Sequence, residues 1–441
     1  MLSIGIRKED KNEFEKRTPL VPNNVKKLLE ENKVEKIYVE PSPIRAYTDD
    51  EYRDAGAEVS DNFWNADIIL AVKEIPVQLI KAEKIYLFFA HVIKGQEYNM
   101  PLLQKLMDEK TTLIEYERII DENNRRLIFF GNYAGYAGMI DTLVGFGQRL
   151  NEEGIENPFT EILPAYKYPD LETAKIEITK IGKKIAAQGL LLTTLPIIVG
   201  FLGYGNVSKG AQAILDCLPV EEIQPENLEE FYKAKKYDNK KIYKVVFYEK
   251  HMVKPIDPEH KFDLLEYFKS GKDLYESQFE QYLPYLSVLI NAIYWSKNSP
   301  RFVTKKWVKE NYSSNNPPRL KMIGDISADV QGAIEITLKC TKSDKPVITY
   351  DIDNDSYVYG VKGKAPSIMS VDNLPCELPK ESSTFFGNIL VNMVPKLVNT
   401  DFSVSFDKLD LSDELKKAVI VYNGKLTPDY EYLNKFLPET S

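Results

Sequence analysis

Short apolar runs alternate with amphipathic stretches from residue 1 to about residue 130. Continuous apolar runs are typical of strands buried on both faces of a parallel sheet, and helical periodicity between them is typical of covering helices. The predicted strands are Leu2–Ile6, Lys36–Val39, Ile68–Val72, Ile85–Phe89 and Thr112–Ile114. The predicted helices are Val21–Glu31, Asp49–Ala55 and Asn99–Lys110. This alternation predicts an α/β domain, here without a phosphate-binding glycine loop.

A second pattern, strand then tight turn then helix, occupies Leu195–Leu218. The branched run Ile197–Val199 leads into Gly203 and Gly205, and apolar residues then recur at helical spacing. Such glycines allow a sharp turn and let a pyrophosphate approach the free N–H groups of the next helix. Ser208 fills the third position of the usual GxGxxG. The motif predicts a dinucleotide site, with a glycine-rich turn of purely structural role as the alternative.

The pattern in the rest of the chain predicts further helices and strands and a division into two domains. Helices are predicted at Tyr133–Leu150, Leu171–Ala187 and Ser382–Val398, and later strands at Ser287–Trp295 and Leu320–Ile323. Four glycines in the first of these helices, Gly135, Gly138, Gly145 and Gly147, predict close packing against another backbone where the two domains meet. Residues 231–285, rich in Tyr and Lys, are predicted to be an insertion. We expect a first domain of residues 1–135 joined by about 366–441, and a dinucleotide-binding domain of residues 136–365.

Composition and net charge narrow the class of protein to which the chain can belong. A chain of 441 residues with 43% hydrophobic and 28% charged residues is predicted to form two globular domains. The net charge of −9 argues against a nucleic-acid surface, and Pro196 with the glycines argues against a membrane span. Three separated cysteines and the absence of a signal peptide favour reduced thiols and a cytoplasmic location. Three histidines make a histidine-based metal site improbable, so no metal is predicted.

Two predicted strands of the first domain end in titratable residues. Ile68–Val72 is followed by Lys73, and Ile85–Phe89 is followed by Ala90 and His91. If these strands are neighbours, the two side chains share one crevice, where burial and mutual repulsion lower the pKa of the lysine and suit it to proton exchange. The alternatives are a core histidine and a surface lysine paired with Glu74. Arg17 follows the first strand, and its planar fork suits a substrate carboxylate.

Eight blocks of the chain, in order, carry a family resemblance: IGIRKEDKNEFEKRTPLVP, LAVKEIP, YLFFAHVIKGQ, YERIIDENNRRLIFFGNYAGYAGMIDTL, GYGNVSKGAQ, LINAIYWSKNSPRFVT, IGDISADVQGAIE and SVDNLPCELP. They resemble the lysine:2-oxoglutarate reductase domain of the α-aminoadipic semialdehyde synthase family and, more distantly, the lysine-forming saccharopine dehydrogenases and alanine dehydrogenases. The resemblance implies two Rossmann-like α/β domains with parallel sheets separated by an active-site cleft. It also implies a reductase that joins lysine to 2-oxoglutarate as saccharopine.

The resemblance implies roles for particular residues. The acid/base pair falls on Lys73 and His91, and the carboxylate-binding arginine on Arg17. Further positions implied to line the substrate crevice are Lys94, Gln96 and Glu117. Positions implied to hold the nucleotide are Gly203, Tyr204, Gly205, Asn206, Val207 and Ser208, with Asp325 near the nicotinamide. Bifunctional members continue into a second domain, whereas this chain stops at Ser441, so one half-reaction is expected.

The cofactor is predicted from the strand that follows the glycine turn. An acid at its tip binds the ribose of NAD, but Val220–Ile223 ends at Gln224 without one. No arginine for a 2′-phosphate is evident either, and the missing acid together with the family resemblance leads us to expect NADPH, with NADH as the alternative. The resemblance also implies lysine, 2-oxoglutarate and saccharopine as small-molecule partners. An NAD-linked, lysine-forming saccharopine dehydrogenase and a non-catalytic nucleotide-binding regulator stay open, as does a homo-oligomer.

Overall fold

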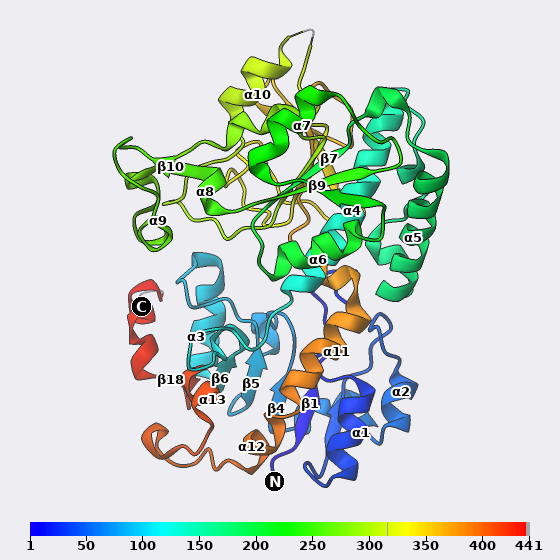
Figure 1. Ribbon diagram of the computed structural model, residues 1–441. Coiled ribbons are helices and arrows are strands. Elements are labelled where there is room, and N and C mark those ends of the chain that lie inside the picture. The colour runs from blue at the N-terminus through cyan, green and yellow to red at the C-terminus, as the bar shows by residue number, and fades with distance from the viewer. Residues whose placement is uncertain (315, 438–441) are drawn as a thin grey trace. The chain divides into compact units, whose positions relative to one another are not determined.

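The computed structural model describes residues 1–314 and 316–437, which form two units (Figure 1). The first unit consists of Met1–Phe130 and the chain from Pro379 onward, and the second of Gly131–Leu378. Each unit contains an eight-stranded sheet flanked by helices. The predicted fold class, two mostly parallel α/β sheets, is confirmed.

The sheet of the first unit has the order β18-β17-β6-β5-β4-β1-β2-β3. Its strands are β1 Ile4–Ile6, β2 Ile37–Val39, β3 Glu58–Val59, β4 Ile68–Leu70, β5 Ile85–Phe88, β6 Thr112–Glu115, β17 Val419–Tyr422 and β18 Lys425–Leu426. β1 to β6 pair in parallel, and β17 adds an antiparallel strand beside β6. The first three helices of this unit match the predictions: α1 Pro22–Glu30, α2 Asp49–Asp54 and α3 Met100–Asp108.

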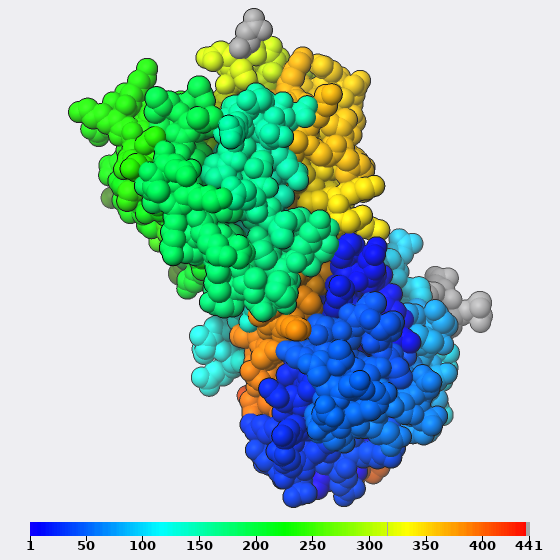
Figure 2. Space-filling model, turned by 90° about the vertical axis from the view of Figure 1, so that its right-hand side faces the viewer, coloured from blue at the N-terminus to red at the C-terminus, as the bar shows by residue number. Residues whose placement is uncertain are grey.

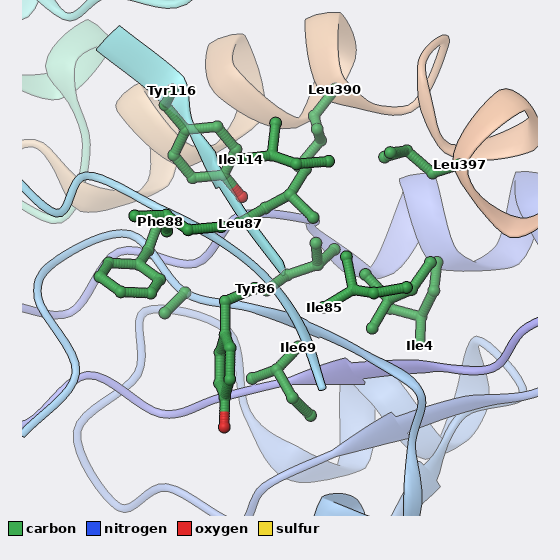
Figure 3. Packing of buried hydrophobic residues seen from close by; sticks show 14 of the residues in the cluster. Ile4, Ile69, Ile85, Tyr86, Leu87, Phe88, Ile114, Tyr116, Leu390 and Leu397 are labelled. Atoms are coloured by element: carbon green, nitrogen blue, oxygen red, sulfur yellow. The ribbon is translucent and has the colours of Figure 1, made fainter. Parts of the chain in front are cut away.

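The C-terminal segment covers the first sheet with helices α11 Pro379–Leu390 and α12 Val394–Asn399, followed by α13 Asp413–Lys417. Figure 2 shows α11, in orange, beside the blue N-terminal residues, and Thr18 N donates to Ser383 Oγ over 3.0 Å. Leu390 and Leu397 reach from these helices into the buried cluster that contains Ile4, seen in Figure 3. The continuous helix predicted at 382–398 is wrong, because Pro395 lacks the N–H that an unbroken helix needs.

The sheet of the second unit has the order β15-β14-β16-β13-β12-β7-β9-β8. Its strands are β7 Ile198–Leu202, β8 Val220–Glu222, β9 Ile242–Phe247, β12 Val288–Asn291, β13 Met322–Asp325, β14 Val347–Asp351, β15 Ser356–Tyr359 and β16 Ser367–Met369. Its helices are α4 Gly131–Glu152, α5 Leu171–Gln188, α6 Asn206–Leu215, α7 Leu228–Ala234, α8 Glu249–Met252, α9 Leu264–Ser270 and α10 Lys305–Tyr312. All neighbours pair in parallel except β14 with β15 and with β16.

Two predicted boundaries differ from the structure. Strand β9 lies inside the predicted insertion at 231–285, yet all six of its residues are buried and it pairs with β7 along its length. The segment that follows β9 does not join the eight-stranded sheet. It contains α8, α9 and a separate two-stranded sheet of β10 Val253–Pro255 with β11 Tyr275–Ser277. Strand β16 belongs to the second sheet, so the chain returns to the first unit at Pro379 and not near residue 366.

The glycines of α4 pack inside the second unit. A Cβ atom on Gly135 would lie 2.0 Å from the carbonyl oxygen of Val207, and one on Gly210 would lie 2.2 Å from that of Asn132. Both distances are far below van der Waals contact, so α4 and α6 approach at backbone distance. The four predicted glycines, Gly135, Gly138, Gly145 and Gly147, all face residues of this unit. Close backbone packing was predicted correctly for Gly135 and Gly147, whereas Gly138 and Gly145 meet side chains. The predicted location between the domains was wrong.

None of the helices within the described residues is long and apolar enough to cross a membrane. The three cysteines, Cys217, Cys340 and Cys376, are all free thiols.

Candidate active site

Strands β4 and β5 are hydrogen-bonded neighbours, as the prediction that Lys73 and His91 lie close together required. Ile68, Ile69 and Leu70 pair with Ile85, Tyr86 and Leu87 in parallel register. The pairing continues past the strand ends, where Phe89 N donates to Val72 O over 3.1 Å. Because the strands run in the same direction, Lys73 and His91 leave the same, carboxyl edge of the sheet.

Lys73 lies in a partly buried position with mixed charges around it. Burial lowers the pKa of its ammonium, and the positive charges of Arg17 and Lys11 lower it further, against the opposing effect of Glu15 and Glu74. Its backbone N–H donates to Glu9 Oε2 over 3.0 Å. The surroundings of Lys73 therefore favour its neutral amine more than the surroundings of a surface lysine would. A neutral amine can accept a proton, which suits proton transfer.

His91 is held in a defined orientation by three contacts. Its Nδ1 lies 2.6 Å from Glu74 Oε1, its N–H donates to Glu115 Oε2 over 3.0 Å, and its carbonyl accepts from Asn99 Nδ2 over 3.0 Å. Its φ of 52° lies in the left-handed region, which L-residues rarely adopt. Burial would raise the pKa of Glu74, but the His91 contact and the charge of Lys11 outweigh it and lower that pKa to about 2. Glu74 thus pairs with the histidine, not with Lys73 as the surface alternative supposed.

Two buried carboxylates that the sequence did not reveal hold the strand ends. Glu9 accepts from the N–H groups of Val72 and Lys73, and Glu115 accepts from those of Ala90 and His91. Burial raises the pKa of Glu9 to about 7 and that of Glu115 to about 8. The available signal was an acidic residue at the end of an apolar run, as in TLIE. The two carboxylates fix the backbone from which Lys73 and His91 project.

Arg17 lies inside the protein, with a partner of its own. Its Nε and Nη2 donate to the two carboxylate oxygens of Glu15 over 2.7 and 2.6 Å. The side chains of Arg17 and Glu15 are 2% and 0% exposed, and the guanidinium lies 4.5 Å from the centre of the Phe130 ring. Arg17 contributes to the charge around Lys73, while its contact with a substrate carboxylate stays a prediction.

The other three positions implied to bind substrate are less closely gathered. Lys94 and Gln96 are exposed, and Gln96 Oε1 accepts from Tyr98 over 3.4 Å. Glu117 forms an ion pair with Arg126. Within the described residues, none of these three side chains is hydrogen-bonded to Lys73 or to the ring of His91.

In the second unit, the glycine turn follows β7 and opens onto a cavity of about 380 Å³. Gly203 has φ +87°, a conformation that favours glycine, and Gly205 is the N-cap of α6 without a side-chain cap. A Cβ atom on Gly205 would meet nothing within 4 Å, so the backbone of Gly203, Tyr204 and Gly205 borders open space at the positive end of a helix. The predicted loop therefore fits a diphosphate group.

Other loop residues have structural contacts. Ser208 is buried and its Oγ accepts from Gln212 over 3.0 Å, while Gly210 packs closely against the backbone of Asn132 in α4. Asn206 and Val207 begin α6 beside Gly131. The Tyr204 ring stacks on that of Tyr248, with centroids 4.6 Å apart.

The position predicted for the cofactor's ribose is wrong in the structure. Gln224 follows β8, which is the edge strand and is separated from β7 by β9. The strand beside β7 is β9, and its tip carries Tyr248 and Glu249; Glu249 lines the same cavity as the glycine turn. The sequence missed Glu249 because β9 comes later in the chain than β8.

Asp325 ends β13 and is buried. Its Oδ1 accepts from Asn291 over 2.8 Å and its Oδ2 from Thr337 over 2.6 Å, and burial raises its pKa to about 6. It does not belong to the lining of the 380 Å³ cavity. Its proximity to a nicotinamide stays a prediction.

A parallel sheet with a glycine turn at a helix N-terminus, opening on a cavity, defines a dinucleotide-binding protein. Residues 5–137 match the family model of the alanine dehydrogenase/PNT N-terminal domain, and residues 206–429 match that of the C-terminal domain. The chain belongs to the alanine dehydrogenase/PNT family and is an NAD(P)-dependent oxidoreductase of the amino-acid dehydrogenase type.

Individual relatives agree with this assignment. The chain is 37% identical over 444 residues to an α-aminoadipic semialdehyde synthase of Arabidopsis thaliana, and 35% identical over 446 residues to the mitochondrial one of Rattus norvegicus. These matches cover 98% of this chain but 41% and 47% of the relatives, so the chain spans less than half their length. It is 28% identical to a saccharopine dehydrogenase [NAD(+), L-lysine-forming] of Candida glabrata, with 90% of this chain and 92% of that protein covered. A solved L-alanine dehydrogenase shares the fold, with a TM-score of 0.62, 18% identity and coverage of 99% of this chain and 100% of that one.

Proposed function

We propose that the protein forms saccharopine from L-lysine and 2-oxoglutarate with a reduced nicotinamide nucleotide. The observation that carries the proposal is the adjacency of β4 and β5, which brings Lys73 and His91 to one sheet edge. The name of the Candida glabrata relative supplies saccharopine and L-lysine, and 2-oxoglutarate comes from the sequence resemblance. The lowered pKa of Lys73 supports proton transfer to and from an amine.

The residues divide the proton traffic between them. Neutral Lys73 accepts a proton from the ε-ammonium of the substrate lysine, and the freed amine adds to the ketone of 2-oxoglutarate. His91, oriented through Nδ1 by Glu74, delivers a proton to the departing hydroxyl, so that one water leaves and a C=N bond forms. Gly203 to Ser208 would hold the nicotinamide nucleotide, which when bound would supply the hydride for reduction of this bond.

The substrate carboxylates need cationic or hydrogen-bond-donating partners. Arg17 and Lys94 are proposed as the cations and the Gln96 amide as a neutral donor, with Glu117 in the lining of the substrate crevice and Asp325 near the nicotinamide. Arg17 acts within its existing pair with Glu15, which fixes the plane of its guanidinium.

Absorbance of the reduced nucleotide tests the function. Protein mixed with lysine, 2-oxoglutarate and NADPH or NADH is expected to oxidise the nucleotide only when both substrates are present, with saccharopine detected by mass spectrometry. Nucleotide binding without turnover on any amino-acid and 2-oxo-acid pair would instead support a regulator. The second candidate, an NAD-linked lysine-forming saccharopine dehydrogenase, is favoured by the similarity to the fungal enzymes of that name. It predicts a faster reaction from saccharopine and NAD⁺.

A cytoplasmic location is part of the proposal, on the grounds of three free thiols. The rat relative is named as mitochondrial, so cell fractionation with antibody detection is the appropriate test.

A further inference from the structure

The tip of β9 occupies the place in the second sheet where nucleotide ribose recognition occurs in this type of fold. β7 leads into the glycine turn, and β9 is its hydrogen-bonded neighbour from Ile198 with Tyr243 to Leu202 with Phe247. The residue at the tip of the strand next to the glycine turn meets the adenosine ribose in dinucleotide-binding sheets. Here that tip continues from Phe247 into Tyr248 and Glu249.

Glu249 and the glycine turn line one cavity. Its wall is formed by Gly203, Tyr204 and Gly205 on one side and by the segment after β9, including Tyr267 and Phe268 of α9, on another. Burial raises the pKa of the Tyr204 phenol, and the neighbouring Glu249 carboxylate raises it further. Burial followed by the same carboxylate raises the pKa of Tyr267 to about 12. The Glu249 carboxylate therefore acts electrostatically on two phenols that line the cavity.

The basic side chains nearest in the chain already have a carboxylate partner. Lys250 Nζ and His251 Nε2 lie 3.1 and 3.0 Å from Glu226 Oε1. Glu249 itself forms none of the salt bridges found within residues 1–314 and 316–437. Among the described residues that line the cavity, none is Lys or Arg. A phosphate on the ribose 2′ position would thus face a carboxylate with no Lys or Arg among the described lining residues of the cavity to balance it.

We propose that Glu249 is the residue that selects the nucleotide, accepting hydrogen bonds from the two ribose hydroxyls of NAD(H) and excluding the 2′-phosphate of NADP(H). The inference rests on the nucleotide-binding part of the proposed function. It reverses the preference for NADPH expected from the sequence, because that expectation took Gln224 as the strand tip.

Direct binding tests the proposal without any turnover. Titration of the full chain with NADH and with NADPH, followed by nicotinamide fluorescence, is expected to give a dissociation constant about 100-fold lower for NADH. Glu249→Gln keeps the size of the side chain and removes its charge, so the ratio is expected to fall to about 10-fold or less. Glu249→Arg is expected to reverse the preference in favour of NADPH.

Gln224→Glu is the matched control, since it places an acid at the tip of the edge strand β8 instead. It is expected to leave the NADH to NADPH ratio unchanged. Circular dichroism and melting temperature verify that each variant is folded.

Equal or tighter binding of NADPH by the unmodified protein would overturn the proposal. So would a ratio that Glu249→Gln and Glu249→Arg both leave unchanged, a ratio shifted by Gln224→Glu, or an absence of binding of either nucleotide. Intact NADH selectivity without lysine-dependent turnover would refute the proposed substrates alone and would support the role of Glu249.

Discussion

Gly205, the N-cap of α6, and Gly210, inside that helix, have opposite surroundings, so alanine at each is expected to affect a different property. Gly205 borders open space, whereas a Cβ atom on Gly210 would lie 2.2 Å from the carbonyl oxygen of Asn132 on α4. Gly205→Ala therefore tests nucleotide binding, and Gly210→Ala tests helix packing, within six residues of the same chain.

The magnitude for Gly210→Ala follows from two opposing terms. Overpacking against backbone costs about 3 kcal/mol, and alanine in a helix interior regains about 1 kcal/mol relative to glycine. The net loss of about 2 kcal/mol corresponds to a melting temperature lower by about 4–8 °C in a domain of this size. Differential scanning fluorimetry measures it, and nucleotide binding below the transition is expected to stay within about twofold because the loop itself is not filled.

For Gly205→Ala the stability terms nearly cancel. Alanine is a poorer N-cap than glycine by several tenths of a kcal/mol, and it restricts the unfolded chain by about 0.4–1 kcal/mol in compensation. Its methyl group enters the space beside the turn, and loss of one charge-assisted hydrogen bond to a phosphate weakens binding about 10- to 100-fold. Unchanged nucleotide affinity in Gly205→Ala would refute the loop as the diphosphate site, and an unchanged melting temperature in Gly210→Ala would refute the backbone contact.

The remaining predictions concern the first unit. Lys73→Met and His91→Gln are expected to lower turnover about 10²- to 10⁴-fold with unchanged nucleotide affinity, while the surface variant Lys26→Met keeps full activity in the same absorbance assay. Arg17→Met leaves the Glu15 carboxylate buried without its guanidinium and is expected to lower the free energy of unfolding by about 3–5 kcal/mol, measured in urea. Adding Glu15→Gln to the same chain is expected to recover part of the lost free energy. No recovery would contradict the pairing of Arg17 with Glu15. The pKa of Glu115 is raised to about 8 from its ordinary value of 4.5, so the folded state binds more protons than the unfolded chain between these values and loses stability as pH rises through them. Melting curves at pH 5 and pH 8 are expected to show this decline, and Glu115→Gln is expected to reduce it; an equally steep decline in the variant would place its cause elsewhere.

Local sequence pattern determined the elements that carry the chemistry. Ile68–Val72 and Ile85–Phe89 are apolar enough to be buried strands, and strands consecutive in the chain tend to lie side by side, so Lys73 and His91 could be placed together in advance. The glycine turn could also be predicted from the sequence. The positive φ at Gly203 and the open space at Gly205 depend on only a few successive residues.

Tertiary structure decided the pairings between distant segments. Glu9 and Glu115 accept from backbone N–H groups more than 20 residues away, and nothing in their immediate neighbours indicates those partners. Whether Arg17 would face Glu15 or solvent depended on the burial of both side chains, which spacing of two residues does not reveal.

The order of strands in the second sheet shows the limit most clearly. By chain order β8 follows the glycine turn, and its tip at Gln224 carries no acid; in space β9 lies beside β7, and its tip carries Glu249. Periodicity reports which side chains a segment buries, and this depends on neighbours three or four residues away. The strand that occupies the place next to β7 depends on the free energy of packing the whole sheet and its helices, and that choice determines which charge borders the nucleotide cavity.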